Sequence, residues 1–249
     1  MYNIIDCGNK LLIKILKIMN KPLVSITVPV YNAKKFLEHT LESLANQTLT
    51  NIEILLVDDG STDGSGVICD RMAQLDSRFK VFHKENGGSA SARQVGLDNS
   101  SGLYYTVCDS DDWVESEMYE ELYNKAVLED SDVVLSGYYM EEENGRTSSQ
   151  QLDDENYYGC SLKENPEILK ITNPFITSKI FRKSFLEKNN IIMEKYRIFE
   201  DLLFCYKSYL LANKISKVNL PLYHYIRRDN VSVTGSFTEK FYDIIPVMT

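Results

Sequence analysis

From Leu23 onward the sequence alternates between short apolar runs and longer segments with helical periodicity. The runs "LVSITVPV", "NIEILLVD" and "LYYTVCD" are rich in β-branched and aromatic residues, which favour strands. In "KKFLEHTLESLANQ" the apolar residues recur at three- and four-residue spacing, which is typical of an amphipathic helix. Strands separated by crossover helices indicate a mostly parallel sheet covered by helices on both faces. The chain is therefore expected to adopt an α/β fold.

This alternation assigns most of the chain to strands and helices. Strands are predicted at 23–30, 51–58, 80–84, 103–109 and 132–139, with one or two more in 214–226. Helices are predicted at 34–47, 64–76, 89–99, 113–129, 166–172, 183–189 and 201–212. The polar, aperiodic segment 140–159 is expected to be a long excursion, and the part after it is expected to complete the same domain.

Composition narrows the kinds of protein that fit. The 249 residues suffice for one domain with a well-buried core. A net charge of −9 argues against nucleic acid as a partner, since phosphate binding needs a basic surface. The five cysteines are scattered without a C-x-x-C pair, which indicates a reduced, cytoplasmic protein and neither a disulfide scaffold nor a zinc module.

The two ends of the chain stand apart from this pattern. Residues 1–21 are expected to form an N-terminal extension ahead of one domain at 22–249. We expect this domain to be truncated at its C-terminus, because the last residues, "FYDIIPVMT", have no helix cap or breaker. In "KLLIKILKIMNK" the lysines recur at helical spacing beside an apolar face. Such a helix at 10–21 can lie on the inner face of an anionic membrane, or pack on the domain or on the second subunit of a homodimer. Alternatively, translation begins at Met19.

Four consecutive predicted strands end in polar clusters, namely "PVYN", "VDDGSTDGS", "HKENGGSASAR" and "CDSDDW". Ligands of parallel α/β sheets bind at the carboxyl ends of the strands, so these clusters are expected to form one groove. Each cluster can also be explained without a ligand: Thr62 or Asp63 can cap the next helix, and the two glycines of "ENGG" can form the turn that opens a helix. Alternatively, these glycines allow the backbone to approach a phosphate closely. Arg93, one turn into that helix, would reach the same edge.

The cluster "DSDD" points to a divalent cation. Asp109 and Asp111 stand two residues apart at the end of an apolar strand, so both carboxylates point the same way if the strand extends that far. Mg²⁺ usually takes one or two carboxylates and completes its shell with substrate phosphates. Alternatively, Asp111 or Asp112 is a helix N-cap and Glu115 completes a capping box. A cap leaves Asp109 unexplained, so we expect a metal site.

Two later segments also carry candidate groups. Glu200 and Asp201 open an amphipathic helix, where acids are common as caps, but a carboxylate there can be a general base if it returns to the groove. The segment "YHYIRRDNVS" carries His224, Arg227 and Arg228, which either form a solvated strand edge or contact phosphate.

In this order and spacing, "VSITVPVYNA", "ILLVDDGSTDGS", "ENGGSASARQVGL" and "DSDDW" closely resemble the family-2 inverting glycosyltransferases of the bacterial polysaccharide type. "FEDLLF" and "YHYIRRDNVS" are similar to later motifs of that family, and the resemblance covers residues 23–234. It implies a GT-A fold and metal-dependent transfer of a sugar, with inversion, from a nucleotide-diphosphate donor, usually a UDP-sugar. The implied acceptor is a hydroxyl of a growing glycan or lipid-linked sugar, as in capsule or lipopolysaccharide synthesis. The alternative is an inactive relative that binds glycan or nucleotide.

The resemblance also implies roles for single residues. Asp111 matches the residue that holds Mn²⁺ or Mg²⁺ on the diphosphate, and Asp201 resembles the catalytic base. Trp113 either stacks on the acceptor sugar or belongs to the core. The nucleotide pocket is implied to contain Pro29, Tyr31, Asn32, Asp59, which reads the base, Arg93, and Asp109, which lies near the ribose. His224 and Arg228 match the late positions that close over the pyrophosphate in the family. Arg227 is an alternative to Arg228 for that role.

A nucleotidyltransferase fits less well. Such an enzyme would have a glycine-rich loop with a basic residue directly after the first strand, where this chain has "PVYNA".

Overall fold

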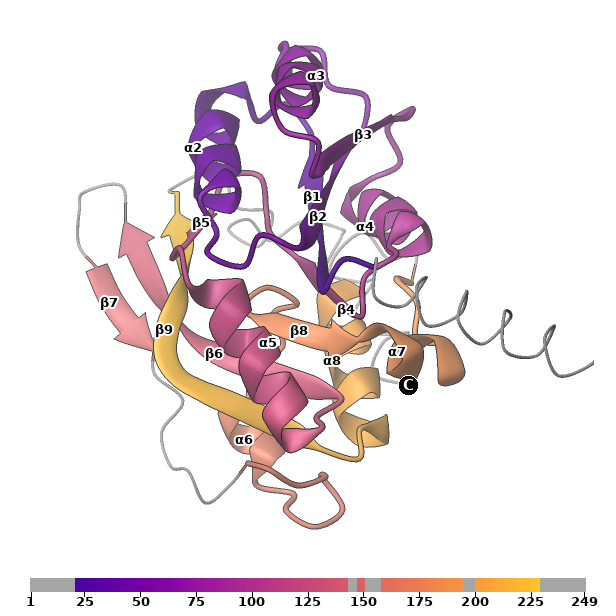
Figure 1. The fold of residues 1–249 in the computed structure, drawn as a ribbon, viewed down its shortest axis with the longest axis vertical. Coiled ribbons are helices and arrows are strands. Elements are labelled where there is room, and N and C mark those ends of the chain that lie inside the picture. Colours follow the sequence, from indigo (N-terminus) through magenta and orange to yellow (C-terminus); the bar gives the residue numbers. More distant parts are fainter. Residues whose placement is uncertain (1–20, 143–146, 151–157, 195–199, 229–249) are drawn as a thin grey trace, which may run out of the picture.

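The structure is a computed structural model that describes residues 21–142, 147–150, 158–194 and 200–228 (Figure 1). Apart from Lys21, the predicted amphipathic extension lies outside these residues, as does the C-terminal end. The predictions for both ends, and the division of the chain at residue 21, therefore stay predictions.

The first half of the chain forms four strands and three helices. In chain order these are β1 (Val24–Val30), α2 (Lys34–Ala45), β2 (Ile52–Asp58), α3 (Ser65–Leu75), β3 (Phe79–His83), α4 (Ser89–Asn99) and β4 (Tyr104–Val107). The strands are parallel and lie in the order β3-β2-β1-β4, because α4 carries the chain back across the sheet (Figure 1). Strands β2 and β3 therefore lie on one side of β1 and β4 lies on the other, which creates a topological switch point between β1 and β4.

The second half extends the same sheet with mixed pairings. Its elements are β5 (Trp113–Val114), α5 (Met118–Glu129), β6 (Val133–Glu142), β7 (Thr147–Gln150), α6 (Ile168–Ile171), β8 (Lys179–Arg182), α7 (Lys183–Lys188), α8 (Glu200–Leu211) and β9 (Ile215–Arg227). From β4 the order continues β8-β6-β9-β5, with β7 beside β6. Only β6 and β9 pair in parallel in this half, whereas β4–β8, β8–β6, β5–β9 and β6–β7 are antiparallel. The predicted α/β fold with a mostly parallel first half is confirmed.

Two predicted elements differ from the structure. The helix predicted at 113–129 begins only at Met118, because Trp113 pairs with His224 of β9 as part of a short strand. The predicted excursion at 140–159 is partly regular, because β6 continues to Glu142 and β7 pairs back onto it. In both places pairing with a partner strand overrides a weak local pattern.

Hydrophobic side chains form two clusters, each including residues from the sheet. Alternate residues of β1 (Val24, Ile26, Val28 and Val30) belong to the first cluster, which also contains buried residues of α2, α3 and α5. The second cluster contains buried residues of α4, α7 and α8 and includes an edge-to-face contact between Phe181 and Phe204. Helices thus cover both faces, as expected for strands joined by crossovers.

Helix α4 lies very close to β1. A Cβ on Gly96 would stand 2.1 Å from the Thr27 Oγ1 atom, so only glycine permits this approach. The close packing at Gly96 holds α4, which carries Arg93, against β1 at the switch point of the sheet.

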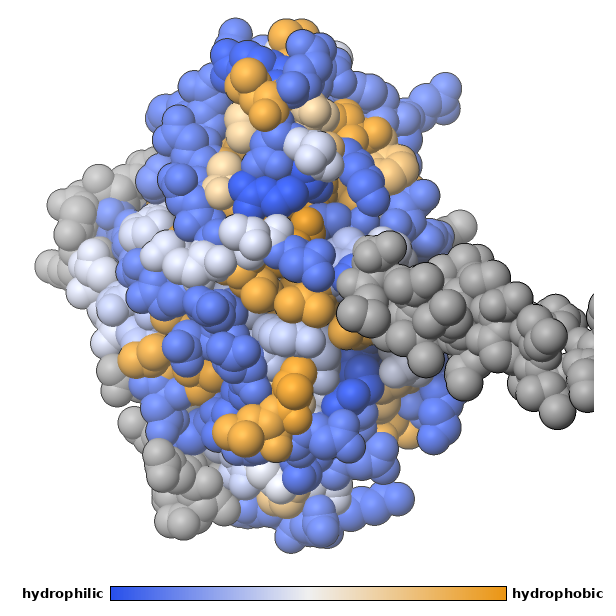
Figure 2. Space-filling model, in the orientation of Figure 1, coloured by the Kyte–Doolittle hydropathy of each residue, from blue (hydrophilic) through white to orange (hydrophobic). Residues whose placement is uncertain are grey.

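Figure 2 shows that the face seen in Figure 1 is mostly hydrophilic, with hydrophobic residues in small separate patches. Within the described ranges, no helix combines the length and the apolar character that crossing a membrane requires.

Candidate functional site

A cleft of about 560 Å³ opens at the switch point, at the carboxyl ends of the parallel strands. Its walls are the loops after β1, β2, β3 and β4 and the first turns of α2 and α4. The cleft brings together seven residues singled out in the sequence, Pro29, Tyr31, Asn32, Asp59, Arg93, Asp109 and Asp111. Sequence reasoning missed other lining residues, among them Phe36, Asn86, Ser89, Ala92 and Ser110. Asp201, His224 and Arg228 are not among the residues that line it.

The loops after β1 and β2 hold each other in place. Asn32 has a positive φ of 49°, and its side-chain oxygen accepts a hydrogen bond from the Thr62 N–H at 2.9 Å. Asp63 accepts the N–H of Lys34, in the first turn of α2, at 2.9 Å and that of Ser65 at 2.9 Å. Asp63 thus accepts the first N–H group of two helices, α2 and α3, which supports the capping explanation of Asp63.

Asp59 organises the loop after β3. Its carboxylate is buried and accepts the N–H groups of Gly87 at 3.0 Å and Gly88 at 2.8 Å, and it pairs with Lys84. Gly88 has a φ of 85°, a conformation that favours glycine. Asp59 lines the cleft as well. Its role in reading a base stays a prediction.

Arg93 links the cluster "DSDD" (residues 109–112), which we call the aspartate motif, to the start of α8. Its guanidinium is buried and donates to Asp109 Oδ1 at 2.9 Å and to Glu200 Oε1 at 2.8 Å. Burial alone would lower the pKa of Arg93, but the charges of Asp109, Glu200 and Asp201 outweigh it and raise the pKa. The role of Glu200 was not predictable, because its partner lies 107 residues away in the sequence.

Asp201 lies next to this ion-pair network. Burial raises its pKa above the usual value, Arg93 opposes the rise, and the charges of Glu200 and Asp109 add to it. The Asp201 Oδ1 atom accepts the N–H of Leu202 at 2.9 Å. A carboxylate with a raised pKa is a better proton acceptor than an ordinary aspartate, as a general base requires.

Asp111 is held by Arg228. The Arg228 Nη1 atom lies 2.5 Å from Asp111 Oδ2, and Nη2 donates to the Asp111 carbonyl at 2.7 Å. The same guanidinium stacks 3.8 Å above the centre of the Phe36 ring. Of the two adjacent arginines, Arg228 is buried against the site and Arg227 is exposed. The contact of Arg228 with pyrophosphate stays a prediction.

Asp112 is not a helix cap, contrary to the alternative considered for it. Helix α5 begins at Met118, and Asp112 is buried. Its carboxylate accepts the Tyr223 hydroxyl at 2.7 Å and the Ile226 N–H at 2.9 Å, and burial raises its pKa well above the usual range. The Tyr223 hydroxyl also accepts the Asp109 N–H at 3.3 Å. Asp112 therefore fastens the aspartate motif to β9.

His224 is enclosed on four sides. Its ring stacks on Trp113, with centroids 3.3 Å apart, and on Tyr139, with centroids 4.5 Å apart. Its Nδ1 lies 2.6 Å from Glu141 Oε1 and its Nε2 lies 3.0 Å from Glu115 Oε1. Trp113 thus packs on His224, outside the two core clusters, and the phosphate contact proposed for His224 stays a prediction.

A divalent cation fits the donor set of the cleft. Asp109 and Asp111 both line it, with side chains 31% and 42% exposed, and each pairs through one carboxylate oxygen with an arginine, Asp109 with Arg93 and Asp111 with Arg228. Within the described residues, no group of three or more His, Cys, Asp or Glu is arranged to bind a metal by itself. Mg²⁺ and Mn²⁺ favour oxygen ligands, and Mg²⁺ commonly leaves part of its shell to substrate phosphates and water. Asp111, the more exposed of the two, is the better candidate ligand.

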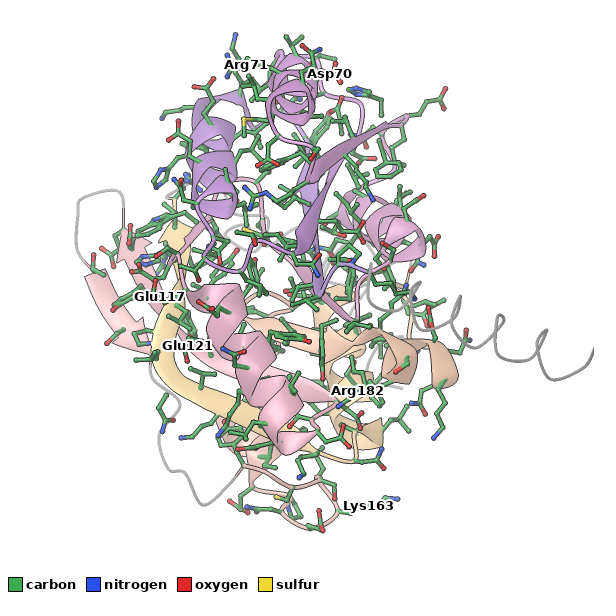
Figure 3. The ribbon with its side chains drawn as sticks, in the orientation of Figure 1. Asp70, Arg71, Glu117, Glu121, Lys163 and Arg182 are labelled. Carbon is green, nitrogen blue, oxygen red and sulfur yellow. The ribbon has the colours of Figure 1, made fainter. Side chains whose placement is uncertain are left out.

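A pH effect on stability is expected at the edge of the site, where His83 bridges two carboxylates. Its Nδ1 lies 2.8 Å from Asp58 and its Nε2 lies 3.0 Å from Asp70, which Figure 3 shows on α3. These hydrogen bonds, that of Asp58 first, raise the pKa of His83. The stabilisation is therefore fully present below the unfolded pKa of about 6.5 and is lost as pH rises through the folded pKa.

Replacing His83 by Gln should accordingly lower the melting temperature more at about pH 5.5 than at about pH 9. Because the His83 side chain is half-exposed, the loss should stay below about 1 kcal/mol. Thermal unfolding of both proteins at the two pH values measures it. An equal loss at both would mean that protonation of His83 does not stabilise the fold.

Fold and cleft together define the class of the protein, an α/β domain of the GT-A type with its ligand groove at the switch point. Residues 25–189 match the family model described as Glycosyl transferase family 2. The chain belongs to this family, and the resemblance noted in the sequence is confirmed.

Relatives in the family include bacterial enzymes. "Glycosyltransferase GlyG" of Streptococcus pneumoniae is 37% identical over 229 residues, covering 86% of this chain and 74% of the relative. "Poly(ribitol-phosphate) beta-N-acetylglucosaminyltransferase TarS" of Staphylococcus aureus is 31% identical over 228 residues, covering 89% of this chain. This chain spans 39% of TarS and 32% of "Glycosyltransferase GlyA" of Streptococcus pneumoniae, so several relatives are much longer.

Solved structures are similar as well. The crystal structure of S. aureus TarS 1–349 in complex with UDP-GlcNAc superposes with a TM-score of 0.76 and 28% identity, covering 90% of this chain and 65% of that one. The mannosyltransferase PcManGT from Pyrobaculum calidifontis, in complex with GDP-Man and Mn²⁺, has a TM-score of 0.58 and covers 86% of this chain and 59% of that one. Because the two sequences are only 18% identical, this similarity supports the fold alone.

Proposed function

We propose that this glycosyltransferase moves a sugar from a UDP-sugar to a hydroxyl of a growing glycan, with inversion and with Mn²⁺ or Mg²⁺ as cofactor. One observation carries the proposal: the polar ends of four parallel strands meet in one cleft that holds Asp109 and Asp111, and Arg93 ties this cleft to the helix of Asp201. The similarity to TarS, solved with UDP-GlcNAc, supports a UDP-sugar as donor.

The donor side of the reaction must stabilise a departing nucleoside diphosphate. As the bond between the anomeric carbon and the diphosphate oxygen breaks, negative charge collects on that oxygen. A divalent cation, when bound, neutralises this charge without any proton transfer. Asp111 would hold it, and Arg228, whose Nη1 atom lies 2.5 Å from Asp111 Oδ2, would contact the diphosphate.

The acceptor side must remove one proton. As the acceptor oxygen forms its bond to the anomeric carbon from the face opposite the leaving group, its hydroxyl proton passes to the carboxylate of Asp201. A single displacement of this kind inverts the anomeric centre and needs no covalent nucleophile. The raised pKa of Asp201 suits it to this step, and the ion-pair network around Arg93 keeps it near the cleft.

Three further aspects remain proposals from the sequence pattern. They are the capsule or lipopolysaccharide nature of the acceptor, the cytoplasmic location, and contact of residues 10–21 with a membrane surface or with a second subunit.

Calorimetric titration with UDP, with and without Mn²⁺, tests the proposal. Binding should require or be strengthened by Mn²⁺, and a screen of UDP-sugars should release UDP from at least one of them. Absence of both heat and thermal shift with UDP and Mn²⁺ would exclude the proposed donor. Binding of UDP without turnover of any UDP-sugar would favour the alternative, an inactive relative that binds nucleotide.

Replacing Asp111 by Asn should abolish the benefit of Mn²⁺ for UDP binding. Loss of an outer-shell partner alone typically weakens metal binding 10–100-fold, so loss of a ligand should cost about 100-fold or more. Asp130→Asn is a matched control, because Asp130 is a largely exposed carboxylate that contacts Arg182 outside the cleft. If Asp111→Asn binds UDP and Mn²⁺ as the control does, Asp111 is not a metal ligand.

A further inference from the structure

Three aromatic side chains contact one another in the second half of the sheet, and we name them the aromatic platform: Tyr138 of β6, Tyr225 of β9 and Phe175 in the segment before β8. The Phe175 ring lies parallel to that of Tyr225, with centroids 6.2 Å apart and planes at 9°. It meets the ring of Tyr138 edge-on at 6.1 Å. Tyr138 and Tyr225 are half-buried, but Phe175 is 44% exposed. The platform thus presents an aromatic surface to solvent.

On one side the platform adjoins the aspartate motif. The Tyr223 hydroxyl contacts both the Asp109 N–H and the Asp112 carboxylate. Tyr225 follows Tyr223 by two residues in the same strand, and Tyr138 pairs directly with Tyr223 across the sheet. Residues two apart in a strand, and residues paired across strands, share a face of the sheet. The platform therefore lies on the face of β9 that touches the aspartate motif.

On the other side the platform is anchored near Asp201. The buried ammonium of Lys179 donates to the Phe175 carbonyl at 2.5 Å and to the Asn173 side chain at 2.5 Å. Tyr209 of α8, the helix that carries Asp201, donates to the Asn173 carbonyl at 2.9 Å. Burial lowers the pKa of Lys179 to about 8, and the charges of Cys205 and Asp201 act in the opposite direction.

We propose that the aromatic platform is the acceptor subsite and binds a neutral pyranose ring whose C–H face stacks on Phe175. This inference rests on the proposed function, because an acceptor hydroxyl must lie between Asp201 and the donor held at Asp109 and Asp111, and the platform is linked to both. The negative face of an aromatic ring attracts the weakly positive C–H groups of a sugar.

Charge selects a neutral ligand over an anionic one. Asp109 and Asp111 line the cleft and Asp201 lies next to the ion pairs of Arg93, whereas Arg93 and Arg228 are already paired with carboxylates. An acceptor phosphate group would be repelled by these carboxylates, and the ammonium of Lys179 is buried and already donates to Asn173 and Phe175. A neutral sugar avoids the repulsion and still uses the aromatic surface.

Saturation-transfer NMR tests the proposal with methyl β-glucopyranoside and methyl β-galactopyranoside as probes, in the presence of UDP and Mg²⁺. Saturation is expected on the ring hydrogens of at least one glycoside. Phe175→Leu should reduce it about fivefold or more, since it keeps apolar bulk but loses the ring face. Phe175→Trp should retain it, and Leu128→Ala, which removes an exposed apolar residue on α5, is the matched control.

The outcomes are separable from those of the proposed function. Absence of saturation on both glycosides, or equal saturation in wild type and Phe175→Leu, overturns the subsite. With octyl β-glucopyranoside, saturation confined to the octyl chain would overturn it in favour of a lipid-binding surface. Failure of the wild-type protein to bind UDP would instead contradict the proposed donor, whatever the glycosides do.

Discussion

Replacing Asp201 by Asn should reduce sugar transfer by about 10²–10⁴-fold, the usual contribution of a general base. The amide keeps the shape of the carboxylate but cannot accept the proton of the acceptor hydroxyl. Asp201 does not line the cleft, so the affinity for UDP should stay within about twofold of wild type. Single-turnover transfer from a UDP-sugar found active in the screen, together with calorimetry for UDP, measures both quantities.

The pH profile makes this test specific to a base. Burial raises the pKa of Asp201, and only the deprotonated carboxylate can accept a proton. Transfer by the wild type should therefore fall as pH decreases through this raised pKa, and Asp201→Asn should lack that limb of the profile. Asp130→Asn, which neutralises an exposed carboxylate, should behave as wild type. If Asp201→Asn transfers as fast as that control, another group is the base.

Replacing Arg93 by Met should destabilise the fold by about 3–5 kcal/mol, the cost of removing one partner of a buried ion pair. Two acids would remain without their cation, Glu200 buried and Asp109 partly buried. Urea unfolding gives the free energy of unfolding for the comparison. The additional change Glu200→Gln should restore part of the loss, because it removes one of the uncompensated charges.

An exposed ion pair provides the control for Arg93. Arg71, labelled in Figure 3, pairs with Glu38. Both side chains are more than half exposed. Arg71→Met should cost no more than about 1 kcal/mol. If Arg93→Met is no more destabilising than Arg71→Met, the buried network around Arg93 does not stabilise the fold.

Much of the fold could be predicted because it depends on local pattern. Alternating apolar runs and helical periodicities predicted the four parallel strands and their crossover helices, with boundaries within a few residues. The cleft could be predicted as well, because crossover connections bring the carboxyl ends of parallel strands to one edge. Seven residues expected there do line it.

Short elements set by pairing could not be predicted. Strands β5 and β8 have two and four residues, too few for a readable period, and they exist because β9, β4 and β6 offer partners. The same pairing delays the start of α5 to Met118.

The sequence by itself determined the α/β class, the position of the cleft and the family, because these follow from residues close together along the chain. Only the tertiary structure decided what each acid contacts. Asp112 fastens the motif to β9, Glu200 holds Arg93, and Asp111 pairs with Arg228, over separations of 107 to 117 residues. Local sequence carries no information about such distant partners. Burial then raises the pKa of Asp112 and Asp201, which separates aspartates that look alike in the sequence.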